Sequence, residues 1–167
     1  MAQPVCNVRT FSIRDGLAAT TISGIAQTPD HLMWFSTWNG LCTYDGYSFT
    51  SFRGGDDSQV ALHSNRLLMA RTNSQNDVWC LSYDKHLYLF NTRECCFTDV
   101  GQLVMSKYGV DLKVRDVYTL ADGYSWVVDT EGKHNFCIND SLIRVGEGIS
   151  PFSTDVQPLF IKKVLLV

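Results

Sequence analysis

Three tryptophans recur at nearly constant spacing along this 167-residue chain. Trp34, Trp79 and Trp126 lie about 45 to 47 residues apart, and each stands in a short apolar run that follows a turn-forming stretch. A period of about 40 to 50 residues is typical of a unit of four short strands, whereas helical repeats of that length show an apolar period of about 3.6 residues. We see no such helical period, so the spacing predicts three copies of one β-unit.

The composition is that of a globular protein, with 45% hydrophobic and 19% charged residues. The net charge is −3 and Lys162-Lys163 is an isolated basic pair, which argues against a nucleic-acid partner. The longest apolar stretches, such as residues 164–167, are far too short to cross a bilayer. The first residues show no secretory signal pattern, and residues 160–167 resemble the beginning of a strand, so we interpret the chain as a fragment.

Each predicted unit reads as four strands separated by turn residues. In the first unit we expect strands at 21–28, 32–37, 40–44 and 47–52. Asp45-Gly46 should join the last two strands as a two-residue turn with positive φ at both positions. Four antiparallel strands of this length make one β-propeller blade. The sequence therefore predicts an all-β fold, a partial propeller whose blades span residues 20–55, 62–101 and 112–147.

Two segments outside these blades also have strand character. Residues 7–16 mirror the outer strand and following loop at 48–55, so we expect an orphan outer strand there. Residues 156–167 should begin a truncated next blade. Closed propellers typically need about four to eight blades, so we expect three blades to expose apolar faces and to associate with copies of themselves.

The cysteines do not form a metal-binding pattern. The chain has six, Cys6, Cys42, Cys80, Cys95, Cys96 and Cys137, and no pair has the C-x-x-C spacing of a zinc site. Cys42, Cys80 and Cys137 fall in predicted strands, where we expect them to fill the core. Cys95 and Cys96 are adjacent and should point to opposite faces of a strand, so a disulfide between them is not expected.

The sequence offers no catalytic constellation. Ser82-Tyr-Asp-Lys85 matches the S-x-x-K string of serine acyl enzymes, but it lies in a predicted hairpin instead of at the start of a helix. The four histidines, His31, His63, His86 and His134, are far apart in the sequence and should lie separately near loops at the surface. We therefore predict no catalytic residue, no metal site and no cofactor.

The tryptophans differ in expected role. Trp34, Trp79 and Trp126 share one position inside a strand, so we expect them in the core between blades, where an aromatic side chain buries a large area. Trp38 instead lies in the turn Trp38-Asn-Gly between strands. It is the candidate for stacking against a ligand, although exposed aromatics also serve ordinary domain contacts.

Several strings of the first unit resemble the two-component regulator propeller repeat. They are Phe11-Ser-Ile-Arg-Asp-Gly-Leu17, Trp34-Phe-Ser-Thr37, Asn39-Gly-Leu41 and Tyr44-Asp-Gly-Tyr-Ser-Phe49. The resemblance spans residues 8–145, is close in the first unit, partial in the second and weak in the third. It implies the N-terminal fragment of a periplasmic hybrid sensor, in which paired propellers precede a membrane helix, a histidine kinase and a response regulator.

This resemblance implies a function that lies partly outside the chain. The fragment would be a non-enzymatic sensor part for glycan-derived oligosaccharides, with the remaining blades, a second propeller and a second copy of the parent as partners. The kinase would lie elsewhere in the parent protein. Two alternatives stay open: an intracellular propeller that serves as a protein-interaction scaffold, and a propeller lyase or hydrolase.

Overall fold

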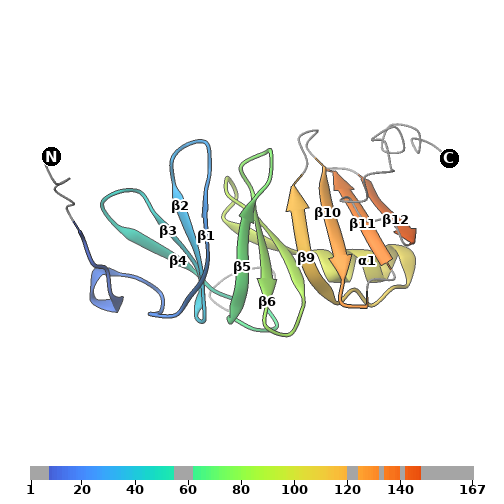
Figure 1. Ribbon diagram of the computed structural model, residues 1–167, viewed down its shortest axis with the longest axis horizontal. Coiled ribbons are helices and arrows are strands. Elements are labelled where there is room, and N and C mark those ends of the chain that lie inside the picture. The colour runs from blue at the N-terminus through green and yellow to red at the C-terminus, as the bar shows by residue number, and fades with distance from the viewer. Residues whose placement is uncertain (1–7, 55–61, 120–123, 132–133, 140–141, 148–167) are drawn as a thin grey trace, which may run out of the picture.

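Three four-stranded antiparallel sheets form the body of the molecule and lie side by side along its long axis (Figure 1). This computed structural model describes residues 8–54, 62–119, 124–131, 134–139 and 142–147. Each sheet is a meander in which consecutive strands are neighbours. The predicted fold class, a partial β-propeller of about three blades, is confirmed at this level.

The first sheet contains β1 (Ile22–Gln27), β2 (Met33–Thr37), β3 (Gly40–Tyr44) and β4 (Phe49–Phe52). Its strands pair in the predicted order, with Trp34 opposite Ala26 on one side and Thr43 on the other. A break in register between Ile22 and Gly24 marks a bulge in β1. The sheet is thus one blade with a local kink at the start of its inner strand.

The turn between β3 and β4 differs from the prediction. Tyr44 pairs with Phe49, so four residues form the connection, and only Gly46 has positive φ (98°). The Asp45 carboxylate causes this geometry, because its Oδ1 accepts the backbone N–H groups of Tyr47 and Ser48 at 2.8 Å each. A side-chain turn of this type replaces the expected two-residue turn and delays the start of β4.

The second and third sheets repeat the plan. The second contains β5 (Leu67–Thr72), β6 (Val78–Ser82), β7 (Leu87–Asn91) and β8 (Cys96–Asp99). The third contains β9 (Val114–Thr119), β10 (Ser125–Asp129), β11 (His134–Asn139) and β12 (Leu142–Glu147). The predicted start of a further blade at 156–167 lies outside the described residues.

The three tryptophans occupy equivalent places. Each is the second residue of the second strand of its blade. Trp34 and Trp79 are each 2% exposed, as expected for core residues, whereas Trp126 is only half-buried. The indole of Trp34 packs 5.5 Å from the Phe90 ring of the next blade, and Trp79 Nε1 donates to Ser125 Oγ of the blade after that at 2.8 Å. The first two tryptophans therefore join one blade to the next.

Two apolar clusters fill the spaces between neighbouring blades. The cluster between the first two blades includes Trp34, Leu41, Leu67, Val78, Tyr88, Phe90 and Phe97. The cluster between the second and third includes Trp79, Leu81, Leu87, Val100, Val104, Val114, Val117 and Val127. Because each cluster draws side chains from two sheets, adjacent blades stabilise each other.

A helix that the sequence analysis missed lies between the second and third blades. Helix α1 (Val100–Tyr108) begins where the Asp99 carboxylate accepts the Gln102 N–H at 2.9 Å, and it ends at Gly109, which has a φ of 69°. Val100 and Val104, one turn apart, are buried in the cluster between these blades. The end signals were in the sequence, but nine residues are too few to show a clear apolar period. Among the described residues no helix is both long enough and apolar enough to span a membrane.

The orphan strand predicted at 7–16 is not formed in the described part of that range. Residues 8–12 have no strand pairing, and Ile13–Asp15 form a short 3-10 helix, η1. Without a partner strand, backbone groups need other partners, and here the Ser12 N–H donates to Asp15 Oδ2 at 2.7 Å. Phe11 packs 5.0 Å from Tyr44, so the segment lies against the first blade through its side chains.

Candidate functional site

The strand order brings two kinds of connection to one edge of the blades. In an antiparallel meander the turn after the second strand and the connection after the fourth strand lie at the same edge. This edge, at the bottom of Figure 1, carries residues 38–39 and 83–86 from the turns and 62–66 and 109–113 from the connections. We call it the loop edge.

Trp38, the predicted stacking residue, lies on the loop edge and is 47% exposed. Its ring is covered by the guanidinium of Arg66, whose Cζ lies 4.0 Å from the ring centroid. The same guanidinium lies 4.6 Å from the centroid of Tyr83, which is 57% exposed. Arg66 is thus stacked on aromatic rings from the first and second blades, and we call these three residues the aromatic–arginine stack.

The blade repeat explains why these residues meet. Trp38 and Tyr83 each follow the second strand of their blade, and each donates its backbone N–H to the residue before the inner strand. Trp38 N–H bonds to Thr21 O at 3.3 Å, and Tyr83 N–H bonds to Arg66 O at 2.8 Å. Arg66 therefore stands in the second blade where Thr21 stands in the first. Sequence analysis missed Arg66 because this equivalence appears only once the strands are paired.

The charge of Arg66 has no acidic partner in the described part of the chain. Its Nε is buried and has no hydrogen-bond partner. A guanidinium that lies over two aromatic rings is restricted in its motion, and its N–H donors suit hydroxyl or carboxylate groups that approach in its plane.

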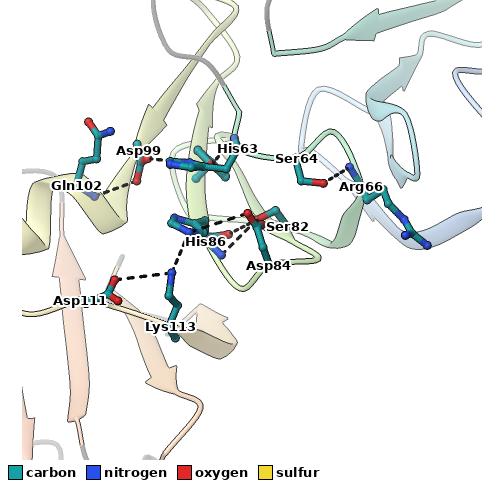
Figure 2. Close-up of polar contacts among 11 residues, drawn as sticks. His63, Ser64, Arg66, Ser82, Asp84, His86, Asp99, Gln102, Asp111 and Lys113 are labelled. Carbon is teal, nitrogen blue, oxygen red and sulfur yellow. Dashed lines mark hydrogen bonds and ion pairs between the residues drawn. The ribbon is translucent and has the colours of Figure 1, made fainter.

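A polar cluster lies beside this stack on the loop edge (Figure 2). The imidazole rings of His63 and His86 stack with centroids 4.1 Å apart and planes at 16°. Asp99 Oδ2 lies 3.7 Å from His63 Nδ1, and Lys113 Nζ lies 2.9 Å from His86 Nε2. Residues from the second blade and from the chain leading into the third thus share one cluster.

The Ser82 hydroxyl shapes the turn that carries His86. It donates to Asp84 Oδ1 and accepts the backbone N–H of His86 at 3.2 Å. The S-x-x-K string therefore lies in a hairpin, as expected, and its serine is occupied by contacts within the turn.

The electrostatics of the cluster favour an uncharged His86. Burial lowers the pKa of His86, and the positive charge of Lys113 lowers it further. Burial works against ionisation of Asp84, but the hydrogen bond from Ser82 leads the contributions that hold its pKa below the usual value. Burial raises the pKa of Tyr88 to about 12, so its hydroxyl keeps its proton at neutral pH.

Asp99 is the most enclosed member of the cluster, with a side chain only 4% exposed. Its Oδ1 accepts the Gln102 N–H that caps α1, while Oδ2 is buried without a hydrogen bond. A buried carboxylate oxygen without a donor is unfavourable, so this atom is a place where a ligand would stabilise the protein.

The prediction that the histidines lie apart is wrong for two of them. His63 and His86 are stacked on each other, whereas His31 lies in the β1–β2 turn at the opposite edge and His134 lies in β11. The error arose because separation in sequence says little about separation across a blade repeat. Counting strands would have placed both residues on the loop edge.

The cysteines among the described residues follow the prediction in part, because Cys95 lies in the turn before β8, with a φ of 53°, instead of in a strand. Cys42 and Cys80 are buried free thiols, and burial raises the pKa of the Cys80 thiol. Cys95 and Cys96 are also free thiols, without a disulfide between them. Cys42 and Cys80 lie within strands, and Cys95 and Cys96 lie at the β7–β8 turn, so these four residues do not contribute to the loop edge.

Comparison with known proteins identifies the architecture. No protein-family model matches the chain, and neither does any curated protein sequence. Among solved structures, it is similar to an extracellular domain assigned to the hybrid two-component system BT3049 of B. thetaiotaomicron, with a TM-score of 0.66 and 17% identity over 84% of this chain. The chain is a partial β-propeller. It spans 20% of the length of that domain.

Two further structures show the range of proteins with this fold. The extracellular domain assigned to BT4673 of the same organism gives a TM-score of 0.57 at 19% identity, over 77% of this chain and 17% of that one. A streptogramin B lyase gives 0.58 at 14% identity, over 80% of this chain and 43% of that one. At these identities the likeness concerns the fold, which sensors and a lyase share.

Proposed function

We propose that this chain is part of the extracytoplasmic sensor propeller of a hybrid two-component system, and that its loop edge contacts a glycan-derived oligosaccharide. The observation that carries the proposal is the exposed aromatic–arginine stack on the loop edge of a propeller whose fold resembles extracellular domains of such systems. In this account the chain is not an enzyme and recognises its ligand without changing it.

The stack has the chemistry that a sugar requires. The exposed parts of Trp38 and Tyr83 offer flat apolar surface for the C–H face of a pyranose ring. The Arg66 guanidinium, which lies over both rings, offers hydrogen-bond donors for hydroxyl or carboxylate groups. Apolar surface with a few fixed polar groups is the usual make-up of a small-molecule site.

Signalling would proceed through a shift in population between two arrangements of the parent protein. The remaining blades, a second propeller and a second copy of the parent are the proposed partners, and the kinase lies outside this chain. A ligand can shift such an equilibrium only by the difference in its affinity for the two states. A bound glycan would therefore have to contact loop edges whose relative position changes between states.

The test is a glycan array probed with the entire extracytoplasmic part of the parent protein, followed by titration of the glycans that bind. Trp38→Ala should weaken binding by about tenfold, as expected for loss of one stacked aromatic contact. Tyr47→Ala is the matched control, because Tyr47 is 91% exposed but lies at the opposite edge. Equal affinity of both variants and the wild type would overturn the proposed surface, and cleavage of a bound glycan would favour the enzymatic alternative.

A further inference from the structure

We propose that His63, His86 and Asp99 bind a divalent transition-metal ion such as Zn²⁺ on the loop edge. One ligand atom from each residue lies within 4.8 Å of the others. Two imidazoles and a carboxylate are a donor set that zinc accepts, with a fourth position left for water or a ligand. This site is separate from the aromatic–arginine stack, so it does not depend on glycan binding.

The spacing is close to that of a zinc site. Bonds of about 2.0–2.1 Å in a tetrahedron place ligand atoms about 3.4 Å apart. The 3.7 Å between Asp99 Oδ2 and His63 Nδ1 already approaches this value. The ligand atoms of the three residues lie up to 4.8 Å apart, so the widest of these distances must shorten by about 1.4 Å to reach the tetrahedral spacing. His63 is exposed and stands in a connection, and His86 stands in a turn, so ring rotation can provide the movement.

Asp99 supplies the independent observation. The Asp99 side chain is only 4% exposed, and its Oδ2 is buried without a hydrogen-bond partner. The other oxygen is committed to the start of α1. A metal ion would satisfy the unpartnered oxygen without disturbing the helix cap.

The second ring nitrogen of His86 has a prepared partner. A metal bound at Nδ1 leaves the proton on Nε2, and Asp84 Oδ2 lies 4.0 Å from Nε2. A carboxylate that accepts the remaining imidazole proton is a usual feature around metal-bound histidine. The Nδ1 atom lies on the Asp99 side, since a Cβ added at Gly101 would be 3.9 Å from it and 3.2 Å from Asp99 Oδ1.

Two groups of the protein compete with the metal. Lys113 Nζ lies 2.9 Å from His86 Nε2, and the Tyr88 hydroxyl lies 2.7 Å from His63 Nδ1. Binding requires Lys113 to move toward Asp111, whose Oδ1 is 3.7 Å away, and requires Tyr88 to release the His63 nitrogen. The ammonium also repels a cation by its charge. Removal of Lys113 should therefore strengthen metal binding. No such gain is expected if the cluster only stabilises the fold.

The experiment is calorimetric titration of the metal-free, untagged chain with Zn²⁺. Cys95→Ser and Cys96→Ser are present in every sample, so that these thiols cannot bind zinc. We expect one ion per chain, loss of binding by at least tenfold in His86→Ala and Asp99→Asn, and tighter binding by several-fold in Lys113→Met. His31→Ala is the control, because His31 is exposed at the opposite edge.

Asp99→Asn separates the loss of a metal ligand from the loss of helix α1. Asparagine also caps helices, so Asp99→Asn should keep α1, and far-ultraviolet circular dichroism checks this. Titration with Co²⁺ gives a second readout, since its visible spectrum changes when nitrogen and oxygen ligands replace water. Absence of zinc binding in the chain that carries only Cys95→Ser and Cys96→Ser, or equal binding in His86→Ala and His31→Ala, would overturn the proposal.

Discussion

At the scale of the residue, a buried hydrogen bond joins the second and third blades. Trp79 Nε1 donates to Ser125 Oγ at 2.8 Å inside the core between the second and third blades. Ser125→Ala leaves this indole N–H buried without an acceptor, so the free energy of unfolding should fall by about 1–3 kcal/mol. Chemical denaturation measures the loss, and Thr130→Ala, at an exposed position of the same blade, serves as the control.

A double-mutant cycle isolates this bond from other effects of the substitution. In a Trp79→Phe background the donor is already absent, so adding Ser125→Ala should cost less than it does in the wild type. Equal costs in both backgrounds would mean that the hydrogen bond does not couple the two blades.

The turn at Asp45 makes a prediction about pH. Hydrogen bonds from the backbone N–H groups of Ser48 and Tyr47 lower the pKa of Asp45 below its usual value of 3.8. Because the folded-state pKa is the lower one, the stabilisation is present above pH 3.8 and is lost as the pH falls through the folded-state pKa. Asp45→Asn should remove this contribution. The stability of the variant should then vary less with pH below 4 than that of the wild type, as followed by thermal unfolding.

The sequence predicts the place of a residue well when its position is set within one blade, and poorly when its contacts come from segments far away in the sequence. The positions of Trp34 and Trp79 follow from the repeat alone, because each blade sets them independently. The contact of Trp38 with Arg66 and the stacking of His63 on His86 join segments that the strand pairing brings together. Such contacts depend on register, which sequence spacing does not define.

At the scale of the element, α1 depends on its ends. Gly109 has a φ of 69°, and a Cβ at this position would meet no atom within 4 Å, so a substitution there tests backbone conformation alone. Gly109→Ala should destabilise the protein by about 0.5–1 kcal/mol, whereas Gly109→Asn should cost less because asparagine tolerates the left-handed region. Equal losses in the two variants, measured by chemical denaturation, would contradict this role.

The sequence predicts the strands well because their pattern of apolar and turn residues recurs in each blade. In the described part of the chain, twelve strands in three sheets recur with the tryptophan period, and their order was predicted. Helix α1 and the segment at 8–16 occur once, so no comparison between repeats could reveal them. The strand predicted at 7–16 had an apolar pattern like that of an outer strand, but its described residues have no partner for their backbone, and η1 formed instead.

At the scale of the whole molecule, the outer faces of a partial propeller should cause association. Trp126 Nε1 in the third blade is buried without a hydrogen-bond partner, whereas Trp79 Nε1 in the second blade bonds to its neighbour. We expect the isolated chain to associate with itself at micromolar concentration and to bind an apolar dye. Analytical ultracentrifugation measures the mass, and a monomer without dye binding would contradict this expectation.

The most direct test of the fold is hydrogen exchange of the tryptophan indole N–H groups, observed by nuclear magnetic resonance and assigned with single Trp→Phe variants. Stacked blades bury Trp34 and Trp79 to 2% exposure and leave Trp38 47% exposed. The account predicts slow exchange for Trp34 and Trp79 and immediate exchange for Trp38. Rapid exchange of Trp34 and Trp79 in a folded protein would show that these indoles do not lie between blades, and would contradict the propeller.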